Sequence, residues 1–260
     1  MQTWTFHQRT FQQTLEKAFD LKLKYLEVYP GQKVGGNIPG TFSYTLTKEQ
    51  REEVKGWMKE RNIQVIAMGV VDKYYYNKDN LEKFFEFARD MNIEYITAEP
   101  EWEDLDEFNR LAKKYGVRVA LHCHPKPESH YWNPDSMATA IHKRKYIGAW
   151  PDIGHWARSG VDIKDGLKKV KKRLWGLHFK DVQELNKLNA PDTLFGKGAC
   201  DLPGVIRKLK RLHFNGVVSL EYERETDDIM SDMNLNIGYF EEITMKWYEK
   251  AAMDLLNKFY

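Results

Sequence analysis

The hydrophobic and polar positions of the chain follow two periods that alternate along its length. Short runs rich in β-branched and aromatic residues are separated by longer stretches in which apolar residues recur at helical spacing. This alternation predicts repeated strand–helix units and a parallel sheet. The predicted strands are residues 3–7, 25–29, 64–70, 95–99, 118–124, 147–153, 174–180 and 216–223. Parallel strands in this number, about eight, can close into a barrel.

Helix start signals lie between the predicted strands. Thr47 and Gln50 have capping-box spacing ahead of an amphipathic stretch that extends to Arg61. Residues suited to N-cap positions precede the other helical stretches: Asp79 or Asn80, Asp104, Asn133, Asp162 and Asp201. The alternation continues without a linker, so residues 1–260 are predicted to form a single domain, an α/β (β/α)8 TIM barrel, which typically has about 250 residues. Residues 232–260 predict a C-terminal helical extension.

Two connections are longer than a barrel requires. One covers residues 30–45 and is rich in glycine, and the other covers residues 181–201 and contains Gly196-Lys197-Gly198. Both follow predicted strands, so both are expected on the face where barrels hold their active sites. Long loops at such a face usually form lids or pocket walls.

Composition narrows the class of partner. The chain is 42% hydrophobic and 30% charged, as in a soluble globular protein, and its 40 Lys and Arg residues nearly balance 38 Asp and Glu residues. A net charge of +2 argues against a nucleic-acid partner. No apolar run reaches the roughly 20 residues of a membrane helix, so no membrane partner is expected. The beginning of the chain lacks an export-signal pattern, which leaves a cytoplasmic or periplasmic location open, and the barrel helices offer faces for a homo-oligomer.

The predicted chemistry collects at the carboxyl ends of the last four strands, which carry His122, Asp152, His178 and Glu221. Side chains alternate across a strand, so these four can all point into one barrel mouth. Two imidazoles and two carboxylates there would suit one divalent ion such as Mn, Co, Zn, Fe or Mg, whereas calcium prefers oxygen ligands alone. A single histidine at a strand end is more often a core residue. Four such residues are harder to explain without a metal, because buried charges lacking partners are costly.

Further residues near the same mouth are candidates for catalysis and binding. Glu221 is the first candidate for a general base, with His124 and Glu99 as alternatives, and Lys180 could donate a proton to a departing oxygen or form a salt bridge. The candidates for substrate binding are His155, Lys126, Trp132, Trp156 and Glu27. Aromatic residues here could stack on a sugar or simply pack under a loop. Glu27 could equally be structural.

An ordered set of short motifs gives the chain a resemblance to a known family. They are Tyr25-Leu26-Glu27, Asp152-Ile153-Gly154-His155, His178-Phe179-Lys180-Asp181, Gly196-Lys197-Gly198 followed by Asp201, and Leu220-Glu221. Over essentially its whole length the chain resembles the xylose isomerase-like barrel superfamily of sugar isomerases and epimerases. The resemblance implies that Asp152, His178 and Glu221 bind metal and that His155 contacts substrate. His122 departs from the glutamate that the epimerases usually carry on this strand.

Four functions follow from these observations. The leading one is isomerisation or epimerisation of a sugar or keto-sugar through an enediolate stabilised by the metal. The second is elimination or hydration on a keto-sugar such as a 3-keto-glycoside or an inosose, because the His-x-His form of the fifth strand also resembles the keto-inositol dehydratase and keto-glycoside lyase branches. The third is a phosphodiesterase of the endonuclease IV type, and the fourth a non-catalytic sugar-binding barrel. Either small-molecule hypothesis makes a carbohydrate the partner.

Overall fold

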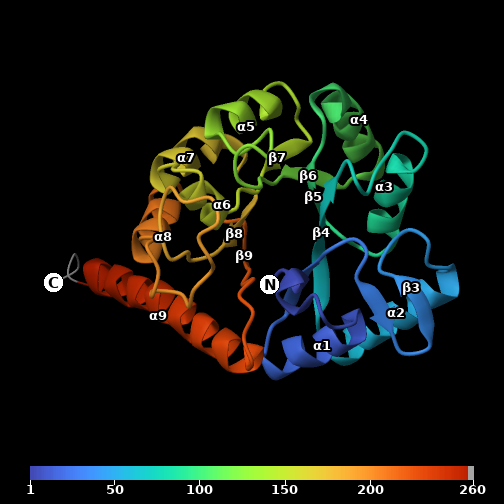
Figure 1. Cartoon of the computed structure of the whole chain (residues 1–260), viewed down its shortest axis with the longest axis horizontal. Helices are drawn as coiled ribbons and strands as arrows, with labels where there is room; N and C mark the ends of the chain where they lie inside the picture. The colour runs from blue at the N-terminus through green and yellow to red at the C-terminus, as the bar shows by residue number, and fades with distance from the viewer. Residues whose placement is uncertain (257–260) are drawn as a thin grey trace.

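The strands form a ring surrounded by helices (Figure 1). The computed structural model describes the backbone of residues 1–256 and the side chains of residues 1–245. Its strands are β1 (Tyr25–Val28), β2 (Lys33–Gly35), β3 (Ile38–Thr41), β4 (Gln64–Asp72), β5 (Tyr95–Glu99), β6 (Arg118–Leu121), β7 (Ile147–Ala149), β8 (Gly176–Phe179) and β9 (Val217–Leu220). Its helices are α1 (Phe11–Asp20), α2 (Lys48–Glu60), α3 (Leu81–Asp90), α4 (Leu105–Tyr115), α5 (Pro134–Ile141), α6 (Ile153–Arg158), α7 (Ile163–Val170), α8 (Leu202–Arg211) and α9 (Ile229–Leu256), with short 3-10 helices η1 (Thr3–Phe6), η2 (Trp102–Asp104) and η3 (Lys171–Arg173).

Parallel pairing runs almost completely around the ring. One sheet has the order β1-β4-β5-β6-β7, and a second pairs β8 with β9. Isolated parallel bridges from Ala149 to Leu174 and from Asp152 to His178 join the two sheets. On the other side, Gln2 bridges to Glu27 and donates its backbone N–H to Leu220 at 3.0 Å. The prediction of a TIM barrel is therefore confirmed.

The prediction of a strand at residues 3–7 is wrong. These residues form η1, which begins after Gln2, whose side chain accepts the backbone N–H of Trp4. Thr3, Thr5 and Phe6 are buried, and burial of the consecutive residues Thr5 and Phe6 departs from the alternation of a strand with one buried face. At the place of the first barrel strand, Gln2 alone pairs with the neighbouring strands β1 and β9.

The helix signals are mostly confirmed. Thr47 and Gln50 form a reciprocal capping box at the start of α2. Asn133, Asp162 and Asp201 each cap a helix with a side-chain oxygen. Asn80 and Asp104 precede α3 and α4 without a side-chain cap. The predicted C-terminal extension corresponds to α9, and residues 257–260 lie outside the described residues.

The two long connections differ in their internal order. Residues 30–45 contain the antiparallel pair β2–β3, a hairpin that the sequence did not predict. Residues 181–201 fold around the Asp181 carboxylate, which accepts the backbone N–H groups of Gly196, Gly198 and Cys200 at 2.9–3.1 Å. A Cβ at Gly198 would lie 2.2 Å from Asp181 Oδ1, so this wrapping requires glycine. The Gly-Lys-Gly motif therefore has a structural role in this loop.

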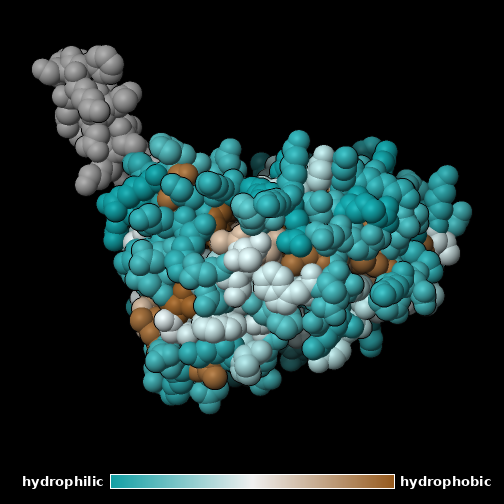
Figure 2. Space-filling model, turned by 90° about the horizontal axis from the view of Figure 1, so that it is seen from above, coloured by the Kyte–Doolittle hydropathy of each residue, from teal (hydrophilic) through white to brown (hydrophobic). Residues whose placement is uncertain are grey.

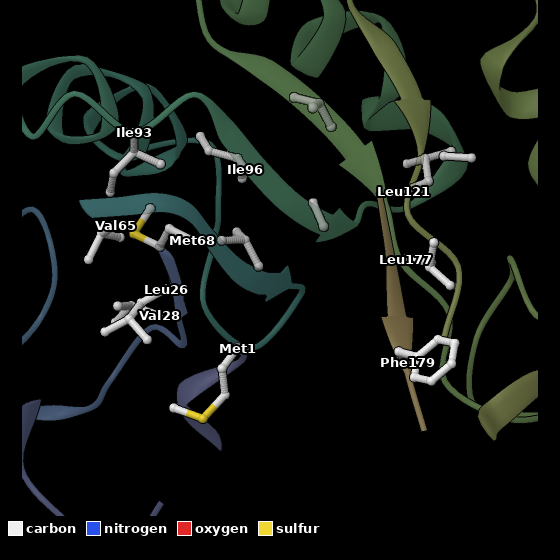
Figure 3. Packing of buried hydrophobic residues seen from close by; sticks show 14 of the residues in the cluster. Met1, Leu26, Val28, Val65, Met68, Ile93, Ile96, Leu121, Leu177 and Phe179 are labelled. Atoms are coloured by element: carbon white, nitrogen blue, oxygen red, sulfur yellow. The ribbon is translucent and has the colours of Figure 1, made fainter. Parts of the chain in front are cut away.

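Buried side chains fill both sides of the strand ring. Between strands and helices, Figure 3 shows Leu26 and Val28 of β1 close to Val65 and Met68 of β4, and all four are at most 1% exposed. Inside the ring, Ala67, Tyr95, Ala120 and Trp150 form a second cluster. The Trp150 and His178 rings lie 6.4 Å apart, so this inner cluster forms the floor of the site described next.

Among the helices of residues 1–256, none combines the length and the apolar composition needed to cross a bilayer. On the face seen in Figure 2, hydrophobic residues are scattered among hydrophilic ones.

Candidate metal centre

Three buried polar atoms near the carboxyl ends of β6, β7 and β8 have no hydrogen-bond partner. They are His122 Nε2, Asp152 Oδ2 and His178 Nδ1, on residues that are at most 2% exposed. Asp152 Oδ2 lies 3.9 Å from His122 Nε2 and 3.7 Å from His178 Nδ1. The three residues offer ligand atoms within 4.8 Å of one another. Buried polar atoms without hydrogen bonds are costly, although Asp152 Oδ2 and His178 Nδ1 have the charged neighbours Lys180 and Glu221. Nitrogen and oxygen donors at this spacing fit a divalent ion.

Two outer carboxylates orient the imidazoles of this centre. Glu99 Oε1 accepts from His122 Nδ1 at 2.8 Å, and Glu27 Oε2 accepts from His178 Nε2 at 2.8 Å. A carboxylate can only accept, so each outer nitrogen carries a proton, and in the neutral form of each ring the lone pair is then on the inner nitrogen. Metal-binding histidines in proteins have this arrangement. Thr97 Oγ1 in turn donates to Glu27 at 2.7 Å, which holds that carboxylate in place.

Asp152 is positioned by the start of α6. It is the N-cap residue, and its Oδ1 accepts the backbone N–H of His155 at 2.9 Å, so Oδ2 is left to face the centre. The close packing here depends on Gly154, where a Cβ would lie 2.8 Å from the Lys180 Cβ. In the Asp-Ile-Gly-His motif, Asp152 is thus both a candidate metal ligand and a helix cap, and Gly154 lets α6 pack closely against Lys180.

Glu221 and Lys180 lie beside the three orphaned atoms. Glu221 Oε2 is 2.8 Å from His178 Nδ1, without the orientation of a hydrogen bond. Lys180 Nζ lies 3.1 Å from Asp152 Oδ2, 3.2 Å from Glu221 Oε2 and 2.6 Å from Glu223 Oε2. Burial lowers the pKa of Lys180, but these carboxylates raise it well above its usual value. The lysine is therefore a buried ammonium in a salt-bridge network, the structural alternative predicted for it.

Two further imidazoles near the centre have opposite electrostatic environments. His124 Nδ1 lies 2.6 Å from Glu99 Oε1, and although burial lowers its pKa, Glu99 raises the pKa to about 9. Burial lowers the pKa of His155 well below its usual value, and Asp152 offsets this only in part. At neutral pH the site therefore presents an imidazolium at His124 and a neutral ring at His155.

A pocket of about 190 Å³ opens onto this centre. Of the residues predicted for the site, His122, His124, His155 and Glu221 are in its wall. Its other lining residues are Gln2, Trp4, Tyr29, Pro30, Gly69, Val70, Asp72, Tyr75 and Glu223. Glu99 lines a neighbouring pocket of about 550 Å³, and His124 lines both pockets.

Several predicted substrate contacts lie elsewhere. Glu27 is 1% exposed and sits behind His178, where it acts on the imidazole rather than on the pocket. Trp156 is fully buried, and its ring packs closely against Gly166, where an added Cβ would lie only 2.8 Å from the ring. Lys126 Nζ lies 5.6 Å from the centre of the Trp132 ring, and neither residue lines the pocket at the centre. The structure therefore gives no support to these four residues as substrate contacts.

An aromatic wall at the pocket was missed by the sequence analysis. Trp4 and Tyr29 meet edge to face with ring centres 4.9 Å apart, and Tyr75 lines the same pocket. Trp4 lies in one predicted strand and Tyr29 ends another. Placing strand-end aromatics at the mouth would have identified Tyr29 but not Trp4, which lies near the start of its predicted strand.

A ring of parallel strands with a candidate divalent-metal centre at their carboxyl ends defines a TIM barrel with its chemistry on the usual active-site face. The sequence agrees with this class over most of its length. The chain belongs to the xylose isomerase-like TIM barrel family, whose sequence profile matches residues 15–243.

Named relatives fall into two reaction types. The chain is 25% identical over 202 residues to an inosose isomerase of Halalkalibacterium halodurans, covering 66% of this chain and 71% of that protein. It is 24% identical over 246 residues to an inosose dehydratase of Lactiplantibacillus plantarum, covering 76% of this chain and 78% of the relative. Both relatives are enzymes by name, and the two names describe different reactions.

Solved structures agree with the fold. An uncharacterised protein of Parabacteroides distasonis is 32% identical, has a TM-score of 0.74, and is matched over 93% of this chain and 97% of that one. The IOLI protein, solved with a bound zinc atom, has a TM-score of 0.76 at 16% identity, with coverage of 95% and 97%. The second similarity is evidence for the barrel fold alone.

Proposed function

We propose that this protein is a divalent-metal-dependent enzyme that isomerises or epimerises a sugar or keto-sugar through an enediolate. The observation that carries the proposal is the set of three buried atoms without hydrogen bonds, on His122, Asp152 and His178, of which His122 lines the pocket. The relatives named inosose isomerase support a polyhydroxylated ketone as the substrate class. A pocket of about 190 Å³ is compatible with one small carbohydrate ring.

His122, Asp152 and His178 would hold the ion, and Glu221 is placed to join them. Bound there, a divalent ion would act as a Lewis acid on the substrate carbonyl and the neighbouring hydroxyl. Nitrogen and oxygen donors together favour Mn, Co, Zn or Fe, and Mg remains a candidate because half of the set is carboxylate. Glu27 and Glu99 keep the two imidazoles in the tautomer that a ligand requires.

The chain supplies an acid and a base in the same pocket. Glu221 lines it as a carboxylate whose pKa lies below its usual value, because Lys180 and His178 outweigh the effect of burial. We assign it proton removal from the carbon next to the carbonyl. His124, held by Glu99 as an imidazolium, would return a proton, and Glu99 acts on His124 rather than as the base itself.

Elimination from a keto-sugar is the second candidate function. The assignment of His124 as the acid favours elimination, because an imidazolium can deliver a proton to a departing oxygen. An epimerase that works with two carboxylates would instead place a second carboxylate opposite Glu221, and His122 stands on the strand where that family group is expected. The relative named inosose dehydratase agrees with this alternative.

The two functions are separated by incubating the metal-loaded protein in deuterated water with ketoses, inososes and 3-keto-glycosides. Isomerisation or epimerisation predicts products of unchanged composition that carry solvent deuterium next to the carbonyl. Elimination predicts loss of water or of the aglycone. Absence of both deuterium incorporation and product on all three substrate classes would contradict the proposal and leave a sugar-binding barrel.

The aromatic wall predicts a binding defect. Replacing Trp4 with alanine should raise KM several-fold to about tenfold, since aromatic contacts of this kind contribute about 0.5–1.5 kcal/mol, and metal content should not change. The matched control is Trp102→Ala, because the two tryptophans are 39% and 38% exposed and only Trp4 lines the pocket. Equal kinetics for the two variants would remove Trp4 from the substrate site.

A further inference from the structure

A buried chain of polar residues connects the pocket to the long loop that follows β8. Arg158, at the end of α6, places Nη1 3.0 Å from His155 Nδ1. A guanidinium has only N–H donors and stays protonated in proteins. Arg158 must therefore donate, and His155 Nδ1 must accept. A neutral ring whose Nδ1 accepts carries its own proton on Nε2.

The other end of the His155 ring faces the candidate metal centre. His155 Nε2 lies 3.7 Å from Asp152 Oδ2, and the residue lines the pocket while only 8% exposed. With its proton on Nε2, this edge can donate a hydrogen bond to a substrate oxygen. Neither ring nitrogen then has a lone pair free for a metal ion, because Arg158 occupies one and the proton occupies the other.

Arg158 is itself held by two further hydrogen bonds. Its Nε donates to the Ala190 carbonyl at 2.8 Å, and Nη2 donates to Asp192 Oδ1. Asp192 Oδ2 accepts the backbone N–H of Glu223 at 2.8 Å. Arg158 and Asp192 are 7% and 2% exposed, so these contacts are shielded from water. The loop of residues 181–201 thereby fixes the arginine between α6 and the segment after β9.

We propose that Arg158 is a positioning residue that locks His155 as the Nε2–H tautomer, with Asp192 as its anchor. The lock makes His155 a hydrogen-bond donor to the substrate and keeps it out of the metal's coordination sphere. Its effect on turnover rests on the function proposed above. The tautomer itself is a property of the protein and can be measured without any substrate.

The test uses protein labelled with ¹⁵N in its histidines, both metal-free and zinc-loaded. Two-bond ¹H–¹⁵N correlation spectra should show His155, identified by its loss in His155→Gln, as the Nε2–H tautomer. In Arg158→Met the resonance should move to a mixture of tautomers or to the charged ring. Arg158→Lys, which retains a donor, should restore most of the Nε2–H form. Arg61→Met, which removes an arginine on the outer surface, is the control.

A second, independent measurement is the effect of each substitution on kcat/KM. Arg158→Met should lower kcat/KM by about 10- to 100-fold, the usual cost of losing a group that orients a site histidine, and Asp192→Asn should follow it more weakly. An Nδ1–H tautomer in the unmodified protein, or an unchanged tautomer in folded Arg158→Met, would overturn the proposal. If the tautomer behaves as expected while no sugar is turned over, the function proposed above fails and the lock remains.

Discussion

Replacing His178 with alanine should remove the divalent ion and lower turnover by about 10³-fold, or roughly 4 kcal/mol of transition-state stabilisation. His178 lies between Glu27 on one side and Glu221 with Asp152 on the other. Its loss removes one nitrogen donor and leaves Glu27 without its imidazole partner. Elemental analysis after dialysis should show about one ion per chain in the unmodified protein and almost none in the variant.

The control is His142→Ala, which removes an exposed histidine at the end of α5. That variant should keep both its ion and its activity. Full metal content in His178→Ala would contradict the proposed centre. Three ions per chain in the unmodified protein would instead favour the phosphodiesterase alternative. An ion that is bound by a protein without any turnover would favour a sugar-binding barrel.

The site residues were predicted mainly from their positions at the ends of strands. Alternation along a strand and convergence of parallel strands are local rules, and together they placed His122, Asp152, His178 and Glu221 at one mouth. The same rules failed at residues 3–7, where a polar side chain, Gln2, caps a short helix in place of a strand. That distinction depends on a hydrogen bond that periodicity does not reveal.

Residues that act through long-range pairs could not be assigned from the sequence. Glu27 and His178 are 151 positions apart, so the sequence could place Glu27 near the mouth but not identify its partner. Trp156 was expected at the mouth because it follows the sixth strand, but that strand ends early and α6 begins at Ile153. The helix turns Trp156 into the core and brings His155 to the pocket wall.

Lys180 contributes a positive charge beside the candidate metal centre. Its ammonium is 1% exposed and lies within 3.2 Å of oxygens on Asp152, Glu221 and Glu223. A divalent ion at the neighbouring orphaned atoms would share two of these carboxylates with the lysine. The two cations therefore repel each other while each offsets the same negative charge.

Replacing Lys180 with methionine should consequently have opposite effects on the two forms of the protein. The metal-free form should lose about 3–5 kcal/mol of unfolding free energy, because buried carboxylates are left without their ammonium. Metal affinity should rise by about tenfold, since removing a like charge a few ångströms away is worth at least 1 kcal/mol even at an effective dielectric constant near 20. Urea unfolding with a chelator and with saturating zinc measures the first effect, and calorimetric titration measures the second.

The control for Lys180→Met is Lys172→Met, which removes an exposed lysine and should change neither quantity. The two effects are linked, because tighter binding to the native state alone must increase the stabilisation that saturating zinc provides. The zinc-dependent gain in unfolding free energy should therefore be larger in Lys180→Met than in the unmodified protein. An equal gain in both proteins, together with unchanged stability of the metal-free form, would show that Lys180 and the ion do not share these carboxylates.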